Sequence, residues 1–206
     1  MKNNMYVYEN KYFYKGYKNI AGVDEVGRGC WAGPLVVAAV ILPPRYRNNQ
    51  INDSKTLSIK KREELFDIIV KDAMDYQIIF IDPIEVDKLN PKNASIEGMQ
   101  RALAGLKIKP DIALVDYEKI NDAKQKVESI TKGDAKSISI AAASIIAKVA
   151  RDRYMIQIND KFPQYNFKKN KGYGTLEHLK ALKKYGPIKN FHRFSYKPVQ
   201  KAINPK

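Results

Sequence analysis

The chain has 206 residues, 44% hydrophobic and 29% charged, which excludes an intrinsically disordered protein and favours one folded domain over residues 1–206. Its 37 Lys+Arg against 22 Asp+Glu give a net charge of +15, more than solubility requires, so a polyanion such as nucleic acid is the expected partner. No apolar run reaches the roughly 20 residues of a membrane span, the N-terminus is unlike a signal peptide, and the single Cys30 excludes an internal disulfide, so we expect a cytoplasmic protein without membrane contact.

The first half of the chain predicts a sheet whose strands alternate with helices. Residues 20–23 and the β-branched run 35–42, which ends at two prolines, predict a hairpin around a glycine-containing loop. Residues 58–73 predict a helix, because apolar side chains recur at helical spacing after a serine that can cap the N-terminus. The next expected elements are a strand at 76–81, helices at 82–89 and 94–106, and a buried strand at 112–115.

The second half is expected to be mainly helical. Residues 127–130 suggest an edge strand, and the longest helical pattern runs from Asp134 to about residue 159, with small side chains in its first half that allow close approach to a sheet. After a polar and aromatic segment, residues 175–185 predict a shorter helix that ends at Gly186. The predicted fold class is therefore α/β, with a mixed sheet core at about 20–160 and a C-terminal helical extension at about 161–206.

The glycine loop after the first strand formally matches a dinucleotide-binding pattern. Gly27 to Ala32 fits G-x-G-x-x-A, and Asp53 lies where a ribose-binding acid would be expected. That site requires a helix to begin at the glycines, whereas here Pro34 and a strand follow. A pyrophosphate would also face Asp24 and Glu25. A cofactor-binding oxidoreductase is therefore a disfavoured alternative.

Acidic residues occur at the ends of several predicted elements. Asp24 and Glu25 end the first strand, Asp116 follows the strand at 112–115, and Asp134 begins the long helix. Each has a structural explanation by itself, as a partner of Arg28, a turn residue or a helix cap. Together they can form a carboxylate cluster at one sheet edge, which suits Mg²⁺ or Mn²⁺. In a basic protein, two such ions about 4 Å apart would support in-line hydrolysis of a phosphodiester.

Several blocks of sequence resemble ribonuclease HII, the type 2 ribonuclease H family. They occur in that family's order and spacing from about Ile20 to Val199, and they are AGVDEVGRGCWAGPLVVAAVIL, NDSKTLS, ALVDY, KGDAKSISIAAASIIAKVARDR, NKGYGT and HRFSYKPV. The resemblance implies a ribonuclease H-like mixed sheet flanked by helices, with a C-terminal helical extension. The sister ribonuclease HIII carries Gly-Lys-Gly in the loop, so Arg28 argues against it.

The resemblance also implies an activity. We expect a metal-dependent endoribonuclease that hydrolyses the RNA strand of RNA/DNA hybrids and incises duplex DNA 5′ of embedded ribonucleotides, leaving 3′-OH and 5′-phosphate ends. The matching metal-binding acids, and hence the catalytic residues for two Mn²⁺ or Mg²⁺ ions, are Asp24, Glu25, Asp116 and Asp134. The alternative class is a non-catalytic RNA/DNA hybrid-binding module whose acids only cap and turn. A monomer is expected, since no apolar surface stripe is evident.

Substrate-binding residues follow from the same resemblance. Gly27, Arg28 and Gly29 match the loop that grips the strand at the ribonucleotide and senses its 2′-OH, the group that distinguishes RNA from DNA. Tyr173 matches the tyrosine that packs against the sugar at the RNA–DNA junction, and Lys55 resembles a phosphate contact. Further candidates for phosphate contacts are Lys148, Lys171 and Arg193.

The chain departs from the family pattern in places, and it offers few histidines. Tyr117 follows Asp116 where the family commonly has glycine, and Cys30, Trp31 and Asn170 also replace the usual residues. The histidines number two, so a zinc or histidine-driven mechanism has little support. His178 is expected on the surface of its short helix.

Overall fold

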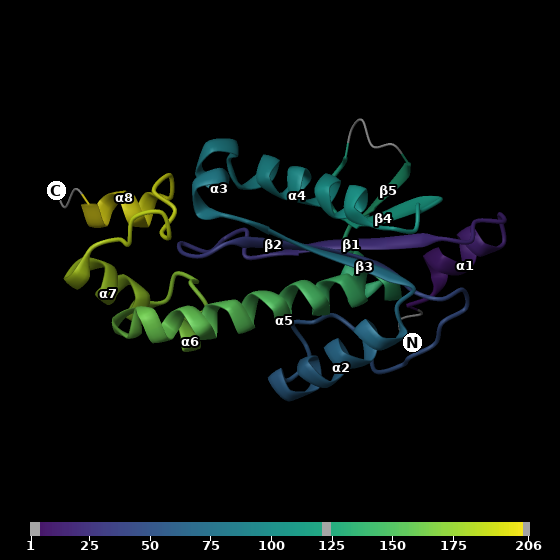
Figure 1. Cartoon of the computed structure of the whole chain (residues 1–206), viewed down its shortest axis with the longest axis horizontal. Coiled ribbons are helices and arrows are strands. Elements are labelled where there is room, and N and C mark those ends of the chain that lie inside the picture. Colours follow the sequence, from purple (N-terminus) through teal and green to yellow (C-terminus); the bar gives the residue numbers. More distant parts are fainter. Residues whose placement is uncertain (1–4, 121–124, 204–206) are drawn as a thin grey trace.

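A computed structural model describes residues 5–120 and 125–203 (Figure 1). Five strands form one sheet in the order β3-β2-β1-β4-β5. β1 pairs antiparallel with β2 and β2 with β3, whereas β4 runs parallel to both β1 and β5. The strand bounds are β1 Ile20–Val26, β2 Leu35–Ile41, β3 Asp75–Ile81, β4 Ile112–Asp116 and β5 Lys126–Ile130. The predicted mixed sheet, its hairpin and its edge strand are confirmed.

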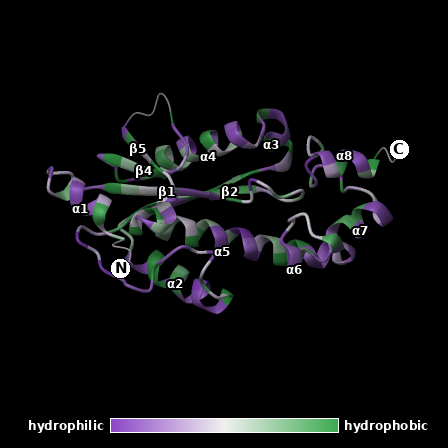
Figure 2. Cartoon of the chain, turned by 180° about the vertical axis from the view of Figure 1, so that it is seen from behind, coloured by the Kyte–Doolittle hydropathy of each residue, from purple (hydrophilic) through white to green (hydrophobic). Residues whose placement is uncertain are grey.

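Helices cover both faces of the sheet. α3 and α4 lie on one face and α5 with α2 on the other, while α6, α7 and α8 follow at the C-terminal end (Figure 1). The helix bounds are α1 Val7–Phe13, α2 Ile59–Asp72, α3 Pro83–Leu89, α4 Pro91–Gly105, α5 Ile138–Lys161, α6 Phe167–Asn170, α7 Leu176–Tyr185 and α8 Lys197–Ile203, with 3₁₀ turns at Gly133–Ala135 and Pro163–Tyr165. The helices carry hydrophobic and hydrophilic residues in alternation, as expected of elements with one face in a core (Figure 2).

β2 shows why this arrangement forms. All seven of its residues are buried, because alternate side chains point to opposite faces and both faces are covered. Val36 and Val40 pack with Leu65 of α2 and the alanines of α5. Val37 packs instead against α4, in the cluster that contains Met99. A continuous apolar strand is therefore stable only at the centre of a three-layer structure.

α5 lies unusually close to the sheet at β1. A Cβ atom added to Gly22 would overlap the backbone carbonyl of Ser139. The helix side of this contact is built from small residues, including Ala141 to Ala143, which are fully buried. The prediction that small side chains bring this helix close to a sheet is confirmed.

The beginning of α5 differs from the prediction. Asp134 does not cap the helix but lies in the 3₁₀ turn Gly133–Ala135. The cap is Ser137, whose hydroxyl accepts a hydrogen bond from the Ile140 amide at 3.2 Å. Asp and Ser are both good caps, so composition could not distinguish them. As a result, the Asp134 carboxylate is available to neighbours other than the α5 backbone.

The C-terminal helices form a core of their own type, rich in aromatic side chains. Phe167, Leu182 and Val199 from α6, α7 and α8 pack together in it. Of these helices, only α7 was predicted, and its start was placed within one residue of the observed start. α6 and α8, like α1 at the N-terminus, are too short to show a clear hydrophobic period. Within residues 5–120 and 125–203, no helix combines the length and apolar character needed to cross a lipid bilayer.

Candidate metal and nucleic-acid site

Three carboxylates meet at one edge of the sheet. β1 and β4 are parallel neighbours, so Asp24 near the end of β1 and Asp116 at the end of β4 reach the same edge. Asp134 approaches from the 3₁₀ turn that precedes α5. One carboxylate oxygen of each lies within 4.8 Å of the others, and we call these three residues the acidic cluster. Such a group of oxygen ligands has the composition and spacing of a divalent-cation site.

The three carboxylates of the acidic cluster are only partly compensated by positive charge, which comes from Lys55 beside Asp134. Burial, reinforced by the charges of Glu25 and Asp116, raises the pKa of Asp24 well above its ordinary value. Burial also raises the pKa of Asp116, and the charge of Asp134 adds to this, although the Gly133 amide donates a hydrogen bond to Asp116 at 2.7 Å. Carboxylates in this state gain stability either by binding a proton or by binding a cation. The residues therefore fit a hard divalent metal ion.

Glu25 stands beside the acidic cluster rather than within its group of three. It follows Asp24 in β1, so the two side chains leave the strand on opposite sides. Burial raises the pKa of Glu25 to about 7; the guanidinium of Arg28 opposes this rise, whereas the charge of Asp116 adds to it. The influence of Asp116 shows that Glu25 remains in electrostatic contact with the cluster.

Lys55 lies at the rim of the acidic cluster. Its ammonium group donates to Asp134 at 3.1 Å, and its side chain is 76% exposed. Partial burial lowers the pKa of Lys55, but the hydrogen bond and charge of Asp134 outweigh this, so the net pKa is raised. Lys55 thus stays charged where the predicted phosphate would approach the cluster.

The glycine loop presents both its backbone and Arg28 beside these acids. Gly27 has a φ of +90°, and a Cβ there would overlap the Arg151 side chain, so only glycine fits. Gly29 is exposed, and a Cβ there would meet no atom within 4 Å, which leaves its backbone open to a ligand. The Arg28 side chain is 36% exposed.

Tyr173 lies on the C-terminal side of the same surface. The Lys148 ammonium and the Arg151 guanidinium each lie 5.6 Å from the centre of its ring. Burial, together with the neighbouring Cys30, raises the pKa of Tyr173 to about 12. The hydroxyl therefore remains protonated at neutral pH and can donate a hydrogen bond.

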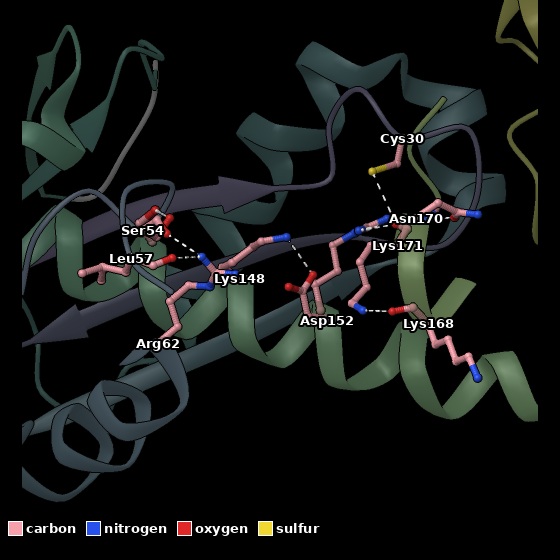
Figure 3. A network of polar contacts seen from close by, with 12 residues as sticks. Cys30, Ser54, Leu57, Arg62, Lys148, Asp152, Lys168, Asn170 and Lys171 are labelled. Atoms are coloured by element: carbon pink, nitrogen blue, oxygen red, sulfur yellow. Dashed lines mark hydrogen bonds and ion pairs between the residues drawn. The ribbon is translucent and has the colours of Figure 1, made fainter. Parts of the chain in front are cut away.

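Three cations connect these parts of the site along α5. Figure 3 shows Arg62, Lys148 and Lys171 in one row, which we call the basic row. Arg62 donates to the carbonyls of Ser54 and Leu57 at 2.9 and 2.6 Å, and Lys148 is paired with Asp152 at 2.8 Å. Burial lowers the pKa of Lys171; the charge of Asp152 opposes this, whereas the neighbouring cations Lys148, Arg151 and Arg62 add to it. The row thus concentrates positive potential, which attracts phosphates.

Arg193 does not have the exposed position expected of a phosphate contact. The side chain is fully buried, with Nε and Nη2 donating to the Gly33 carbonyl at 3.2 and 2.9 Å. Its Nη1 donates to the Arg28 carbonyl at 3.0 Å. Arg193 therefore holds the glycine loop from beneath, so its selection as a phosphate contact is wrong.

His178 is also buried, because it forms a hydrogen-bonded pair with His192. Their Nε2 atoms are 3.0 Å apart, and the Ile188 amide donates to Nδ1 of His192 at 2.9 Å. His192 must then carry its proton on Nε2 and donate it to His178, whose Nδ1 donates to the Tyr173 carbonyl at 2.9 Å. The expected surface position of His178 is wrong, since its helix turns this face toward the aromatic core.

Two buried residues at the site were missed from the sequence. Glu118 pairs with Arg28 at 2.5 Å, and Arg151 donates to the carbonyls of Pro34, Lys171 and Ala32. Glu118 directly follows the ALVDY block, which was the available signal. Arg151 offered none, because a cation in a helix is usually solvated.

A mixed sheet with an acidic cluster at the ends of its central strands, next to an open glycine loop and a basic row, defines a nuclease of the ribonuclease H class. Residues 21–199 match the family model for ribonuclease HII. The chain is 51% identical over 183 residues to a ribonuclease HII of Mycoplasma capricolum, covering 88% of each chain. It belongs to the ribonuclease HII family and is an endoribonuclease acting on RNA/DNA hybrids.

Solved structures agree with this assignment. The ribonuclease H2 of Pyrococcus horikoshii superposes with a TM-score of 0.77 at 28% identity, covering 89% of this chain and 96% of that one. The ribonuclease HII in a complex with PCNA from Archaeoglobus fulgidus gives 0.74 at 30% identity, covering 87% of this chain and 95% of that one. The ribonuclease H-like fold expected from the sequence is therefore confirmed.

Proposed function

We propose that this endoribonuclease also incises duplex DNA on the 5′ side of an embedded ribonucleotide, leaving 3′-OH and 5′-phosphate ends, with two Mn²⁺ or Mg²⁺ ions held by the acids at the sheet edge. The observation that carries the proposal is the acidic cluster, whose oxygens lie within 4.8 Å of one another. The raised pKa of Asp24 and Asp116 supports it, because repelling carboxylates favour a bound cation.

The protein contributes position and charge to this reaction. Asp24, Asp116 and Asp134 would hold the ions, and Glu25 would complete the set from the opposite side of β1. Ions bound there would supply an activated water and stabilise the leaving oxygen of an in-line displacement. No protein nucleophile is required, and Lys55 at the rim is placed to attract the phosphate.

Selection of a ribonucleotide requires contact with its 2′-OH. The open backbone of Gly29 and the half-exposed Arg28 would grip the strand there. Tyr173, still protonated, would pack against the sugar at the RNA–DNA junction. The basic row and Lys55 would bind flanking phosphates. All these residues belong to one chain, so we propose that a monomer is the active form. We also propose that residues 1–206 form one domain and that the protein is cytoplasmic.

One assay tests the proposal. The purified chain is incubated with duplex DNA bearing a single ribonucleotide, with EDTA, Mg²⁺ or Mn²⁺, and the break is mapped at nucleotide resolution. We expect cleavage 5′ of the ribonucleotide only when metal is present. The same duplex without the ribonucleotide is the matched control and should stay intact.

Two outcomes would contradict the proposal. Binding of the duplex without cleavage in either metal would favour the non-catalytic hybrid-binding module. Cleavage of the all-DNA control at a similar rate would remove the role of the 2′-OH. Either result is distinct from loss of folding, which circular dichroism of the same sample reports.

A further inference from the structure

The guanidinium of Arg28 lies between two carboxylates. Its Nη1 is 2.5 Å from Oε1 of Glu118 and 3.8 Å from Oε1 of Glu25. The first is a charge-assisted hydrogen bond, whereas the second is a longer electrostatic contact. Glu118 is therefore the partner that sets the position of Arg28.

Glu118 is held rigidly for this contact. It lies in the loop that follows β4, and its side chain is only 4% exposed. The preceding Tyr117 has a φ of +60°, a conformation that disfavours non-glycine residues by about 1–2 kcal/mol. The turn persists because the Glu118 amide donates to the Asp116 carbonyl at 2.7 Å and the Ser129 hydroxyl donates to the Glu118 carbonyl at 2.6 Å.

The backbone of Arg28 is fixed separately. Its carbonyl accepts hydrogen bonds from Arg193 at 3.0 Å and from the Tyr196 hydroxyl. With the backbone anchored, the remaining freedom of Arg28 is rotation of its own long side chain, which costs rotamer entropy to order. Glu118 removes that freedom before a substrate arrives.

Glu118 also determines whether Glu25 pairs with Arg28. Without Glu118, Glu25 is the carboxylate that already lies 3.8 Å from the Arg28 guanidinium. A modest side-chain rotation would bring the two into direct contact and turn Arg28 away from the open face of the loop. It would also occupy a carboxylate that we assign to the metal site.

We propose that Glu118 is a positioning residue for substrate binding, which holds the Arg28 guanidinium at the open face of the glycine loop and keeps it off Glu25. The proposal rests on the proposed role of Arg28 in gripping the ribonucleotide-containing strand. Glu118 acts through Arg28 and touches neither substrate nor metal.

The test is a double-mutant cycle on KM and kcat with duplex DNA bearing one ribonucleotide. Glu118→Leu should raise KM about tenfold, which corresponds to about 1.4 kcal/mol. It should also raise the Mn²⁺ concentration needed for half-maximal rate. Glu118→Gln keeps an oxygen acceptor and should raise KM only a few-fold. In an Arg28→Ala background, Glu118→Gln should change KM by less than twofold, because coupled residues are not additive.

The matched control is Glu85→Leu. Glu85 forms an equally short pair with Arg101, at 2.5 Å, between α3 and α4. This variant should leave KM unchanged, and the thermal melting of every variant reports folding. If Glu118→Leu does not fold, the nearly isosteric Glu118→Gln carries the test alone.

Four results would overturn the inference, and they are distinguishable. An unchanged KM in folded Glu118 variants would refute only the role of Glu118. The same would follow if Glu118→Gln changed KM by the same factor in the Arg28→Ala background as in the wild-type chain. A wild-type KM in Arg28→Ala refutes the role of Arg28. Absence of metal-dependent cleavage by the wild-type chain refutes the proposed function itself.

Discussion

Two buried polar regions of this protein are built in opposite ways. At the sheet edge, the carboxylates of the acidic cluster approach one another within 4.8 Å, and the pKa of Asp24 and of Asp116 is raised. Beneath the C-terminal helices, Arg151 is fully buried with its guanidinium donating to three backbone carbonyls at 2.8, 2.8 and 3.1 Å. Nearby, the pair of His178 and His192 uses all four of its ring nitrogens.

The difference separates function from structure. A buried group whose partners are complete stabilises the fold and has nothing left to offer a ligand. A buried charge left next to like charges is unfavourable for folding and is retained where it binds something. Burial of polar residues is common to both regions, so only the completeness of their partners distinguishes them.

The largest expected effect is on turnover when a cluster acid is neutralised. Asp116→Asn or Asp24→Asn should lower kcat by at least about 10²–10³-fold, the effect of removing one electrostatic contributor from an active site. Binding of RNA/DNA hybrid should remain, and metal-free stability should rise, because carboxylate repulsion is relieved. Steady-state cleavage and thermal unfolding in EDTA measure both. Near-normal cleavage by both variants would refute the assignment of the metal site.

In the other region the same kind of change should act on stability. Arg151→Met would remove the guanidinium from the carbonyls of Pro34, Lys171 and Ala32, at about 1–3 kcal/mol for each buried group that stays unsatisfied. We expect the free energy of unfolding to fall by about 3 kcal/mol or more, measured by urea denaturation. A fall below about 1 kcal/mol would show that water replaces the guanidinium.

The two regions should respond to pH with opposite signs. The pKa of Glu25 is raised from 4.5 to about 7, so between these values the folded state binds more protons, and metal-free stability falls as pH rises. The pKa of His192 is lowered from 6.5 to about 3 by burial and by His178, so there the unfolded state binds more protons, and stability falls as pH falls. Each change in stability amounts to on the order of 3–5 kcal/mol over its whole window.

Variants separate these overlapping slopes. In urea denaturation with EDTA between pH 4.5 and 7.5, Glu25→Gln should reduce the loss of stability toward high pH, and His192→Phe should reduce the loss toward low pH. Addition of Mn²⁺ should flatten the first slope only. An effect of Mn²⁺ on the second would contradict the division into two regions.

The smallest expected effect concerns Tyr173, which belongs to both regions. Its ring lies 5.6 Å from Lys148 at the exposed surface, while its carbonyl accepts from His178. Tyr173→Ala removes only the ring, so we expect a loss of about 1–2 kcal/mol in kcat/KM on a single embedded ribonucleotide. The loss on a long hybrid should be smaller. Equal losses on both substrates would argue against a role in sensing the ribonucleotide.

Much of this molecule follows from local sequence pattern. The apolar runs of β1, β2 and β4 and the capped helices α2 and α7 were predicted to within a few residues, because hydrophobic period and caps are local signals. The convergence of Asp24 and Asp116 follows from strands that end at the same sheet edge. Asp134 was selected as a candidate ligand, and it does join the acidic cluster, although its place in the 3₁₀ turn was not predicted.

What escaped prediction depends on distant contacts. Arg193 and His178 looked like surface residues because cations and histidines in polar segments usually are. Their burial results from partners such as Gly33 and His192, which lie far from them or on another element of the chain. Glu118 is similar, since its partner Arg28 is 90 residues away. Whether a buried polar group has all of its hydrogen-bonding and charged partners is the property that distinguishes the two regions, and it can be seen only in the folded chain.

The missing side chain of Gly22 has a consequence at the sheet edge two residues further on. It lets α5 contact β1 at Ser139, and the turn that carries Asp134 leads directly into that helix. A methyl group at Gly22 would push the start of α5 away from β1 and move Asp134 away from Asp24, although all three residues of the acidic cluster would still be present. The spacing of the acidic cluster therefore depends on the absence of a side chain at Gly22.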